Sequence, residues 1–481
     1  MKIDRSPFSG GRSGWPKAGP GWRKPAGISA VKVRSLPKAV AVAPRAETLS
    51  RPERIAYGAF LLFVALIYIT PGTLYPPLEN WPISKGLAIL SFVFLWFAMR
   101  SKRASWRMTD PASLWLITFM AIGGLSILTA LWPVYALNVF LDVLKLLLVY
   151  LLVIHLVDRL ERVRRLFWVM LWGAMVPAVG TLMHYFLKID PIEGYRFAWI
   201  GVYADPNDLA YNLVVLIPIG LALLEAERSF VKKLFVLGIL AVFMAAIYVT
   251  FSRGGLVGLM AVFFFQVLRS RNRTLHFSLA AVLLVTLLAA APARYWERAE
   301  TILTFRQDES AMGRVYAWKA GLSMIQDRPL LGVGIGCFVL GWPIYAPPEA
   351  GTKWRAAHNT FVAVMGESGL LGLAAFGAFM GAALRGAQRV SRPARPAPLP
   401  LFRPLSLMKT APPAEGPSVS GEDRKAGLYA RGVEIALWGF LACSLTLGIA
   451  RSWPPYLFAG LAVALHTIRA AELRMEKGEL E

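Results

Sequence analysis

Long runs of apolar residues recur along the whole chain, and this repetition constrains the fold more than any other feature. Each run has about 17–25 residues, enough to cross roughly 30 Å of hydrocarbon as a helix, whose backbone polar groups are bonded internally. Among 481 residues, 56% are hydrophobic and only 17% are charged, which does not fit an ordinary soluble domain. We therefore expect an all-α polytopic membrane protein.

Twelve transmembrane helices are predicted from these runs. The polar sequence SRGG divides the apolar stretch Val231–Leu268, because one straight helix of that length would exceed the bilayer. The predicted spans are 55–71, 85–99, 112–132, 136–156, 166–187, 209–225, 232–251, 255–268, 275–292, 358–384, 432–450 and 455–469.

The remaining segments divide the chain into regions of different character. Residues 1–54 carry twelve Lys or Arg against three acids and are predicted to be a disordered tail. The first nine spans occupy 55–292, the loop 293–357 follows with amphipathic helices at Tyr295–Phe305 and Ser310–Gln326, and the tenth span is 358–384. A basic, Pro-rich loop (385–431), the last two spans (432–470) and a tail (471–481) complete the chain.

Lys and Arg alternate between the loops and predict the orientation of the protein. Loops on one face carry fourteen of these residues, whereas the short loops opposite hold four, namely Lys85, Lys188, Arg196 and Arg253. By the positive-inside rule, both termini and the basic loops are cytoplasmic. The net charge of +23 is explained by attraction to anionic lipid headgroups, so we expect no nucleic-acid partner.

Metal and cofactor chemistry find no support in the sequence. The five histidines and two cysteines, Cys337 and Cys443, form no metal-ligand cluster, and no DxD sequence is present. DxD holds a divalent cation against a nucleotide-sugar diphosphate in many glycosyltransferases, so its absence weighs against that type of donor. We therefore expect no metal and no cofactor.

Two arginines and a histidine are the main candidate site residues. Arg253 lies on the face where arginine is scarce, which favours a functional role over contact with lipid phosphate. Arg314 lies on the second amphipathic helix, in the long loop of the same face. His358 precedes the tenth span, where it either takes a proton near neutral pH or is an ordinary interfacial histidine; Asn359 beside it can cap that helix.

Other polar residues of this face have two possible interpretations each. Glu367 either lines a site or stabilises a helix kink. Asp205 and Asn207, in the sequence YADPNDLA, either line the site or form a turn and helix cap. The sequence GVGIGCF indicates a turn packed against the membrane domain, or a close backbone approach to phosphate. In the fourth span, Asp142 and Lys145 are predicted to form a structural ion pair.

Three motifs in this order resemble the O-antigen ligase and polymerase superfamily. They are SRGGLVGL, GRVYAWKAGLSMIQDRPLLGVGIGCF and HNTFVAVMGESGLLG, and the resemblance covers about Asp205 to Leu373. It implies twelve spans in a bacterial inner membrane, cytoplasmic termini and a long periplasmic loop. The basic tail and the Arg/Pro loop depart from the family pattern.

The resemblance also implies a reaction. A glycan is transferred with inversion from undecaprenyl diphosphate to an acceptor hydroxyl, on lipid A-core or a growing polysaccharide, without metal. Arg253 and Arg314 correspond to family arginines that bind the diphosphate, and His358 to the histidine that takes the acceptor proton. Arg196, Asp205, Asn207, Asn359 and Glu367 are further candidates for lining the site. Ligase, polymerase and protein-glycosylating activities stay open, and a lipid-linked oligosaccharide flippase or another transporter is the alternative function.

Overall fold

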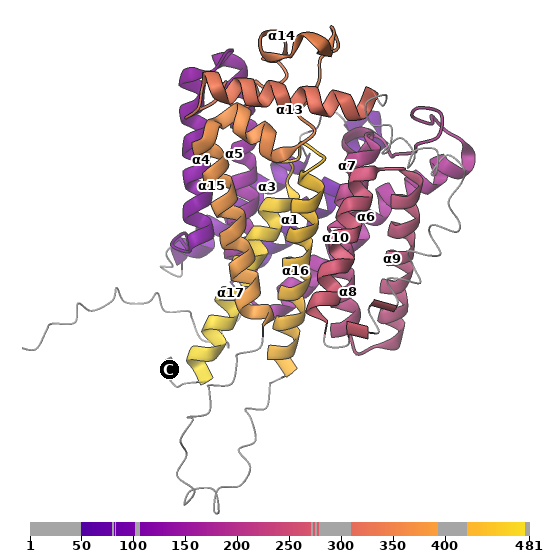
Figure 1. Cartoon of the computed structure of the whole chain (residues 1–481). Coiled ribbons are helices and arrows are strands. Elements are labelled where there is room, and N and C mark those ends of the chain that lie inside the picture. The colour runs from indigo at the N-terminus through magenta and orange to yellow at the C-terminus, as the bar shows by residue number, and fades with distance from the viewer. Residues whose placement is uncertain are drawn as a thin grey trace, which may run out of the picture. The chain divides into compact units, whose positions relative to one another are not determined.

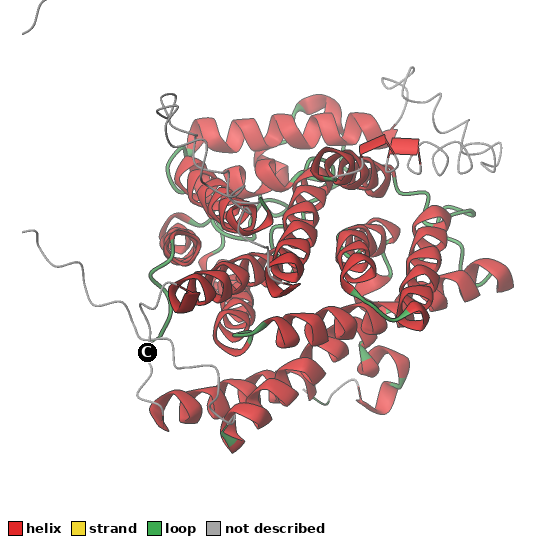
Figure 2. Ribbon diagram, turned by 90° about the horizontal axis from the view of Figure 1, so that it is seen from below, coloured by secondary structure: helices red, strands yellow, loops and turns green. Residues whose placement is uncertain are grey.

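The computed structural model describes the ranges 50–78, 83–101, 106–270, 309–392 and 421–476, together with residues 81, 273–274 and 277–278. Within these ranges the protein is built from helices, and an isolated β-bridge joins Ile192 to Arg196. Figure 2 shows helices and loops but no strand among these residues. The predicted all-α class is confirmed.

Nine helical segments of the described chain are long and apolar enough to cross a membrane. They are α1 (Arg51–Ile69), α3 (Ile83–Ser101), α4 (Pro111–Leu125) with η2 (Ser126–Thr129), α5 (Pro133–Leu156), α6 (Leu160–Leu187), α7 (Pro206–Val214) with α8 (Ile217–Ala226), α9 (Phe230–Val249), α15 (Thr360–Ser391) and α17 (Pro454–Glu476). Two further helices, α10 (Arg253–Arg269) and α16 (Gly421–Ser444), stand among them in Figure 1. The chain is a multi-pass membrane protein.

Two of the twelve predicted spans correspond to α10 and α16, which fall outside these nine. α10 has only 17 residues, and the first turns of α16 carry charged side chains such as Glu422 and Asp423. The span predicted at 275–292 lies almost entirely outside the described residues, as does the amphipathic helix at 295–305. The number of twelve spans therefore stays a prediction.

Several helix ends differ from the predicted boundaries because polar turns extend the helices beyond their apolar runs. α1 begins at Arg51, inside the predicted tail 1–54, with a proline in its first turn. α15 continues to Ser391 and α16 begins at Gly421, so both enter the predicted loop 385–431. α17 likewise reaches Glu476 in the predicted tail 471–481, whereas α16 differs in the other direction and ends at Ser444, short of residue 450.

Two breaks in the apolar runs position the candidate functional site described below. The predicted break at SRGG is confirmed, since α9 ends at Val249 and α10 begins at Arg253, with Ser252 accepting a hydrogen bond from the Gly255 amide at 3.1 Å. The span predicted as continuous over 209–225 is instead divided between α7 and α8. Pro218 has no N–H to continue the ladder of backbone hydrogen bonds through this junction.

The glycine-rich loop that follows α13 (Glu309–Asp327) docks into a break in α15. Gly369 has φ 68° and ψ −170°, a conformation open essentially only to glycine, and interrupts the helix. The amide of Val333 donates to the carbonyl of Gly366 at 2.9 Å, and that of Gly334 to the carbonyl of Glu367 at 3.0 Å. The loop thus satisfies carbonyls that the break leaves open, and it forms the packed turn that was one interpretation of GVGIGCF.

α13 lies across one end of the helices in Figure 1, which we call the α13 end. Its bounds, Glu309–Asp327, agree with the predicted helix 310–326. The large apolar side chains of Trp318 and Leu322 are exposed, whereas Ala320 and Met324 are buried. The face of α13 that packs on the protein is therefore the one with Ala320 and Met324, and the apolar stripe with Trp318 and Leu322 faces away from it.

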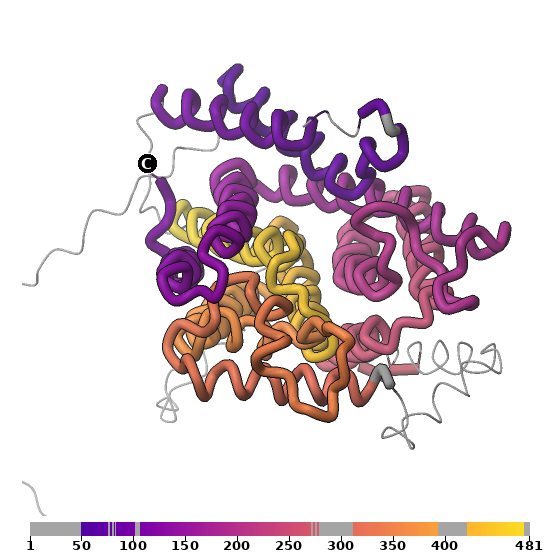
Figure 3. The backbone as a smooth tube through the Cα atoms, turned by 90° about the horizontal axis from the view of Figure 1, so that it is seen from above, coloured from indigo at the N-terminus to yellow at the C-terminus, as the bar shows by residue number. Residues whose placement is uncertain are grey.

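The C-terminal helices lie between the others. α16 packs against α8, α10, α15 and α17, and Figure 3 shows the yellow α16 and α17 between the orange α15 and the magenta helices of the middle of the chain. On α5, Lys145 and Asp142 form the predicted ion pair. Short helices join the long ones: α2 (Pro71–Leu74), η1 (Pro76–Leu78), η3 (Gly201–Tyr203), α14 (Trp342–Tyr345) and η4 (Pro348–Ala350).

Candidate functional site

A cavity of about 470 Å³ lies where the segments before α7, α10 and α15 meet α13 and the loop after α6. We call it the arginine cavity, since its lining includes Arg196, Arg253, Arg314 and Arg355. His358 also lines it, with Glu193 and Asp205 as the two acids. Four guanidiniums against two carboxylates give the cavity an excess of positive charge, so it is suited to an anionic group such as a diphosphate.

Asn207 links three of these segments through one side-chain oxygen. Its Oδ1 accepts a hydrogen bond from Nη2 of Arg196 at 2.9 Å and another from Oγ of Ser252 at 2.8 Å. Arg196 also donates from Nε to the carbonyl of Thr250 at 3.1 Å and is only 7% exposed. The wall built by the loop after α6, the start of α7 and the start of α10 is therefore fixed before any ligand arrives.

Arg253 occupies the first helical position of α10, directly after the Ser252 cap. A helix N-terminus carries partial positive charge and unpaired amides, and both favour an anion nearby. A Cβ at Gly254 would lie 2.5 Å from Oγ1 of Thr446, and one at Gly255 would lie 2.7 Å from Cβ of Ala210. The two glycines of SRGG therefore let α10 approach α7 and the segment after α16, and this approach sets the position of Arg253.

Arg355 lies against α13 at Gly313, the residue that precedes Arg314. A Cβ on Gly313 would come within 2.0 Å of Nη1 of Arg355 and 2.6 Å of its Cζ. Only glycine therefore leaves room for this guanidinium beside Arg314. Gly313 and Arg355 are not among the site residues predicted from the sequence, although Arg355 stands three residues before His358 in the same predicted loop.

His358 is held by the chain on its C-terminal side. Its backbone has φ 44°, in the left-handed region, directly before the cap of α15. Asn359 accepts hydrogen bonds from the amides of Phe361 and Val362 at 2.9 and 3.1 Å, and Thr360 donates to the carbonyl of Leu447 at 2.7 Å. These contacts fix the backbone that follows His358, and His358 itself lines the arginine cavity.

The surroundings of His358 favour the neutral form of its imidazole. Burial lowers the pKa of His358, and the guanidinium of Arg314 lowers it further. The carboxylate of Asp205 opposes this and raises the pKa, while Arg355 lowers it. A neutral imidazole is the form that can accept a proton, so the net effect suits a general base at neutral pH.

Of the eight predicted site residues, six line the arginine cavity: Arg196, Asp205, Asn207, Arg253, Arg314 and His358. Asp205 also caps α7, because its Oδ1 accepts a hydrogen bond from the Asn207 amide at 2.7 Å. Asn359 does not line the cavity and instead caps α15.

Glu367 also lies outside the lining of the arginine cavity. It precedes the α15 break, where its Oε1 is 3.9 Å from Nη1 of Arg451. This placement matches the alternative of a kink residue. In the described part of the chain, no group of three or more His, Cys, Asp or Glu side chains is arranged to hold a metal ion.

Two comparisons with known proteins give matches to this chain. The family model described as O-antigen ligase matches residues 235–377, a range that contains Arg253, Arg314, Arg355 and His358. The exopolysaccharide production protein ExoQ of Rhizobium meliloti (strain 1021) is 25% identical over 310 residues, which cover 60% of this chain and 68% of ExoQ. Together these matches support a membrane glycan transferase of the ligase or polymerase type.

Proposed function

Since the resemblance to the O-antigen ligase superfamily is confirmed by the match over residues 235–377 and by similarity to ExoQ, we propose that this protein transfers a glycan from undecaprenyl diphosphate to an acceptor hydroxyl. The observation that carries the proposal is the convergence of four arginines and His358 on one cavity, from segments far apart in sequence. The diphosphate ester of the donor supplies the energy, and the released lipid diphosphate is the anion that the cavity stabilises.

The reaction assigns a role to each group. The acceptor oxygen attacks the anomeric carbon of the donor sugar, and the bond from that carbon to the diphosphate oxygen breaks. His358 takes the proton of the acceptor hydroxyl as the new glycosidic bond forms. Arg253, Arg314 and Arg355 bind the leaving diphosphate, whose charge grows as the bond breaks, so their hydrogen bonds strengthen in the transition state.

The distribution of Lys and Arg supports an orientation for this chemistry. The arginine cavity is at the α13 end, and the loops that the sequence predicts on the other side of the membrane carry fourteen basic residues. We therefore assign the cavity to the periplasmic side of a bacterial inner membrane, with both termini in the cytoplasm. The acceptor class is a growing polysaccharide or lipid A-core, and similarity to a protein named for exopolysaccharide production favours the polysaccharide.

A reconstituted assay tests the proposal. The purified full chain is mixed with an undecaprenyl-diphosphate glycan and candidate acceptors in the presence of a chelator, and the His358→Ala variant runs in parallel. We expect a metal-independent glycosidic product that the variant does not form. Transfer that is undiminished in a folded His358→Ala protein would contradict the mechanism, and movement of glycolipid across the bilayer without transfer would favour the flippase.

A further inference from the structure

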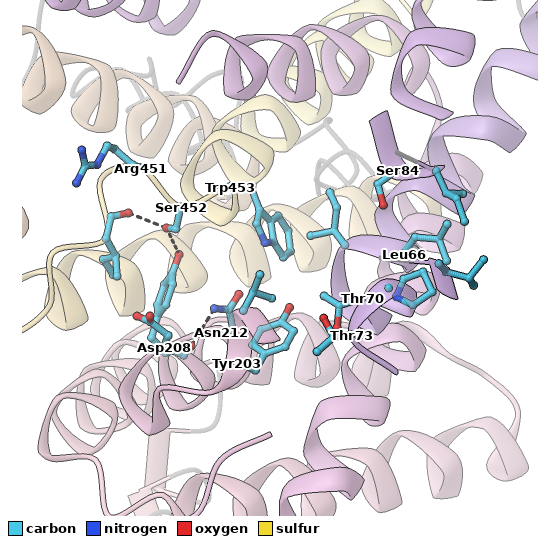
Figure 4. Close-up of a pocket in the computed structure, with 18 of the residues that line it drawn as sticks. Leu66, Thr70, Thr73, Ser84, Tyr203, Asp208, Asn212, Arg451, Ser452 and Trp453 are labelled. Atoms are coloured by element: carbon cyan, nitrogen blue, oxygen red, sulfur yellow. Dashed lines mark hydrogen bonds between the residues drawn. The ribbon is translucent and has the colours of Figure 1, made fainter. Parts of the chain in front are cut away.

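A second cavity, of about 590 Å³, lies beside the arginine cavity at the same end of the helices. It is bounded by the turn between α1 and α3, by α7 and by the segment between α16 and α17 (Figure 4). We call it the Trp453 pocket, and its volume is in the range of ordinary small-ligand sites.

The Trp453 pocket combines aromatic faces with hydroxyl and amide groups. Tyr203, Tyr211 and Trp453 contribute rings, and the ring of Trp453 is held edge-on against Tyr68 at a centroid distance of 4.7 Å. Hydroxyl and amide groups come from Thr70, Thr73, Ser84, Asn212 and Ser452. Sugars present apolar C–H faces and hydroxyl edges, so this mixture of rigid rings and neutral polar groups matches a saccharide.

Three buried polar atoms of the pocket have no hydrogen-bond partner within the protein. They are Oγ1 of Thr70, the hydroxyl of Tyr203 and Oδ1 of Asn212. Tyr203 is 1% exposed and Asn212 is 8% exposed. Figure 4 shows all three residues on the side of the pocket that faces Trp453. Because buried polar groups in proteins are nearly always bonded, three such atoms around one pocket indicate a ligand that supplies the missing partners.

The composition of the pocket excludes two other parts of the reactants. A polyprenyl chain would leave the three polar atoms buried without partners, which is unfavourable. A diphosphate would find Arg451 as a cation but Asp208 as an opposing carboxylate, whereas the arginine cavity offers four guanidiniums. The pocket therefore suits a neutral, hydroxyl-rich group.

The Trp453 pocket and the arginine cavity share walls. Residues Ala204–Asn207 line the arginine cavity, and the flanking Tyr203 and Asp208 line the pocket. Gly448 also lines the pocket, and a Cβ placed on it would point to within 4.0 Å of the His358 amide. The pocket therefore adjoins the backbone of His358 at Gly448.

We propose that the Trp453 pocket binds the saccharide of the glycan acceptor and directs its hydroxyl toward His358. This inference rests on the proposed transfer reaction and names the part of the site that selects the second substrate. Tyr203, Thr70 and Asn212 form hydrogen bonds to acceptor hydroxyls, and the ring of Trp453 packs on the apolar face of the sugar.

Two substitutions test the pocket without changing its shape. Tyr203→Phe removes a hydroxyl and Thr70→Val replaces one with a methyl group, and neither hydroxyl has a hydrogen-bond partner in the protein, so neither change is expected to lower the thermal midpoint. Each raises the acceptor KM roughly three- to tenfold, the factor that one neutral hydrogen bond contributes, and leaves the donor KM unchanged. The matched control is Tyr57→Phe, whose buried hydroxyl donates to the Arg162 carbonyl at 2.7 Å; it lowers the thermal midpoint and leaves the acceptor KM unchanged.

A binding measurement separates this inference from the proposed function. The probe is a neutral oligosaccharide, released by mild acid from the polysaccharide of the bacterium that makes this protein. Its binding to the full chain is followed by saturation-transfer NMR. The wild-type protein binds it, and the Tyr203→Phe/Thr70→Val protein binds it more weakly. Variant-sensitive binding without transfer by wild type would refute the reaction and retain the pocket. An unchanged acceptor KM with unchanged binding would refute the pocket alone, and so would an effect confined to the donor KM.

Discussion

Gly313→Ala is expected to weaken donor binding without weakening the fold. The new Cβ would lie 2.0 Å from Nη1 of Arg355, whereas nonbonded atoms of this kind sit about 3.5 Å apart, so the guanidinium must move by roughly 1.5 Å. If that movement breaks the bond from Arg355 to the donor diphosphate, the loss is about 1.5–3 kcal/mol, the contribution of one charged hydrogen bond. This corresponds to a roughly 10- to 150-fold rise in the donor KM.

The thermal stability of the Gly313→Ala protein is expected to stay the same or rise. Gly313 lies within α13, and alanine in a helix is more stable than glycine by about 0.5–1 kcal/mol. The matched control is Gly377→Ala in α15, because a Cβ there has no neighbour within 4 Å. Both variants should keep or raise the thermal midpoint of the detergent-solubilised protein, and only Gly313→Ala should raise the donor KM.

A double-mutant cycle decides whether Arg355 carries the effect. If Gly313→Ala acts only by displacing that guanidinium, it has no further effect on the donor KM in an Arg355→Ala background. The assay is initial-rate glycan transfer at varied donor and saturating acceptor, for wild type, both single variants and the double variant. Additive effects in the double variant would refute the reasoning, because Gly313 would then act without Arg355.

The remaining predictions concern the base and the packing. Arg314→Gln removes a charge that lowers the pKa of His358, so the acidic limb of the pH–rate profile should move to higher pH. Asp205→Asn removes a charge that raises this pKa, so the acidic limb should move to lower pH. Identical profiles for the variants and the wild type would contradict the assignment of His358 as the base. Glu434→Ala should destabilise the protein by about 3 kcal/mol with an unchanged donor KM, because Glu434 is fully buried and accepts hydrogen bonds from Arg269 and Ser391; an unchanged thermal midpoint would contradict this. Gly369→Ala should lower the thermal midpoint, since its Cβ would lie 2.1 Å from the carbonyl oxygen of Leu330 at a φ of 68°; a midpoint equal to wild type would show that the loop does not need this contact.

The meeting of Arg253, Arg314 and His358 could be predicted because topology alone brings them to one face. Alternating loop charges and the number of spans between these residues determine on which side of the membrane each one lies. The long helices could be predicted because each apolar run is long enough to cross a bilayer. The break at SRGG followed from the length of the apolar stretch that it divides.

The fine positions could not be predicted because they depend on helix rotation. The contact between Gly313 and Arg355 exists because α13 turns the face with Gly313, Ala317 and Ala320 toward the protein, and the apolar periodicity of the helix does not identify that face. Glu367 was ambiguous for a related reason, since its surroundings depend on the break at Gly369, which a single glycine in a helical pattern does not reveal.

Ion pairs at the end of the helices opposite α13 could not be predicted from the sequence either. The sequence predicts Arg162 and Arg269 only as two of the fourteen basic loop residues. In the structure Arg162 pairs with Glu53 at 3.0 Å, and Arg269 pairs with Glu434 at 2.5 Å. Their partners are 109 and 165 residues away in the chain, so no local pattern could link them. The positive-inside prediction does not use such partners, because it counts only the basic residues on each side.

The most direct test of the central claim is the amount of undecaprenyl diphosphate released for each glycosidic bond formed. It is measured with the purified full chain in chelator, for wild type, His358→Ala and Arg253→Gln. We predict one lipid diphosphate per bond for wild type, no detectable bond formation for His358→Ala, and a raised donor KM for Arg253→Gln. Full transfer by a folded His358→Ala protein, or bond formation without release of the lipid diphosphate, would contradict the account.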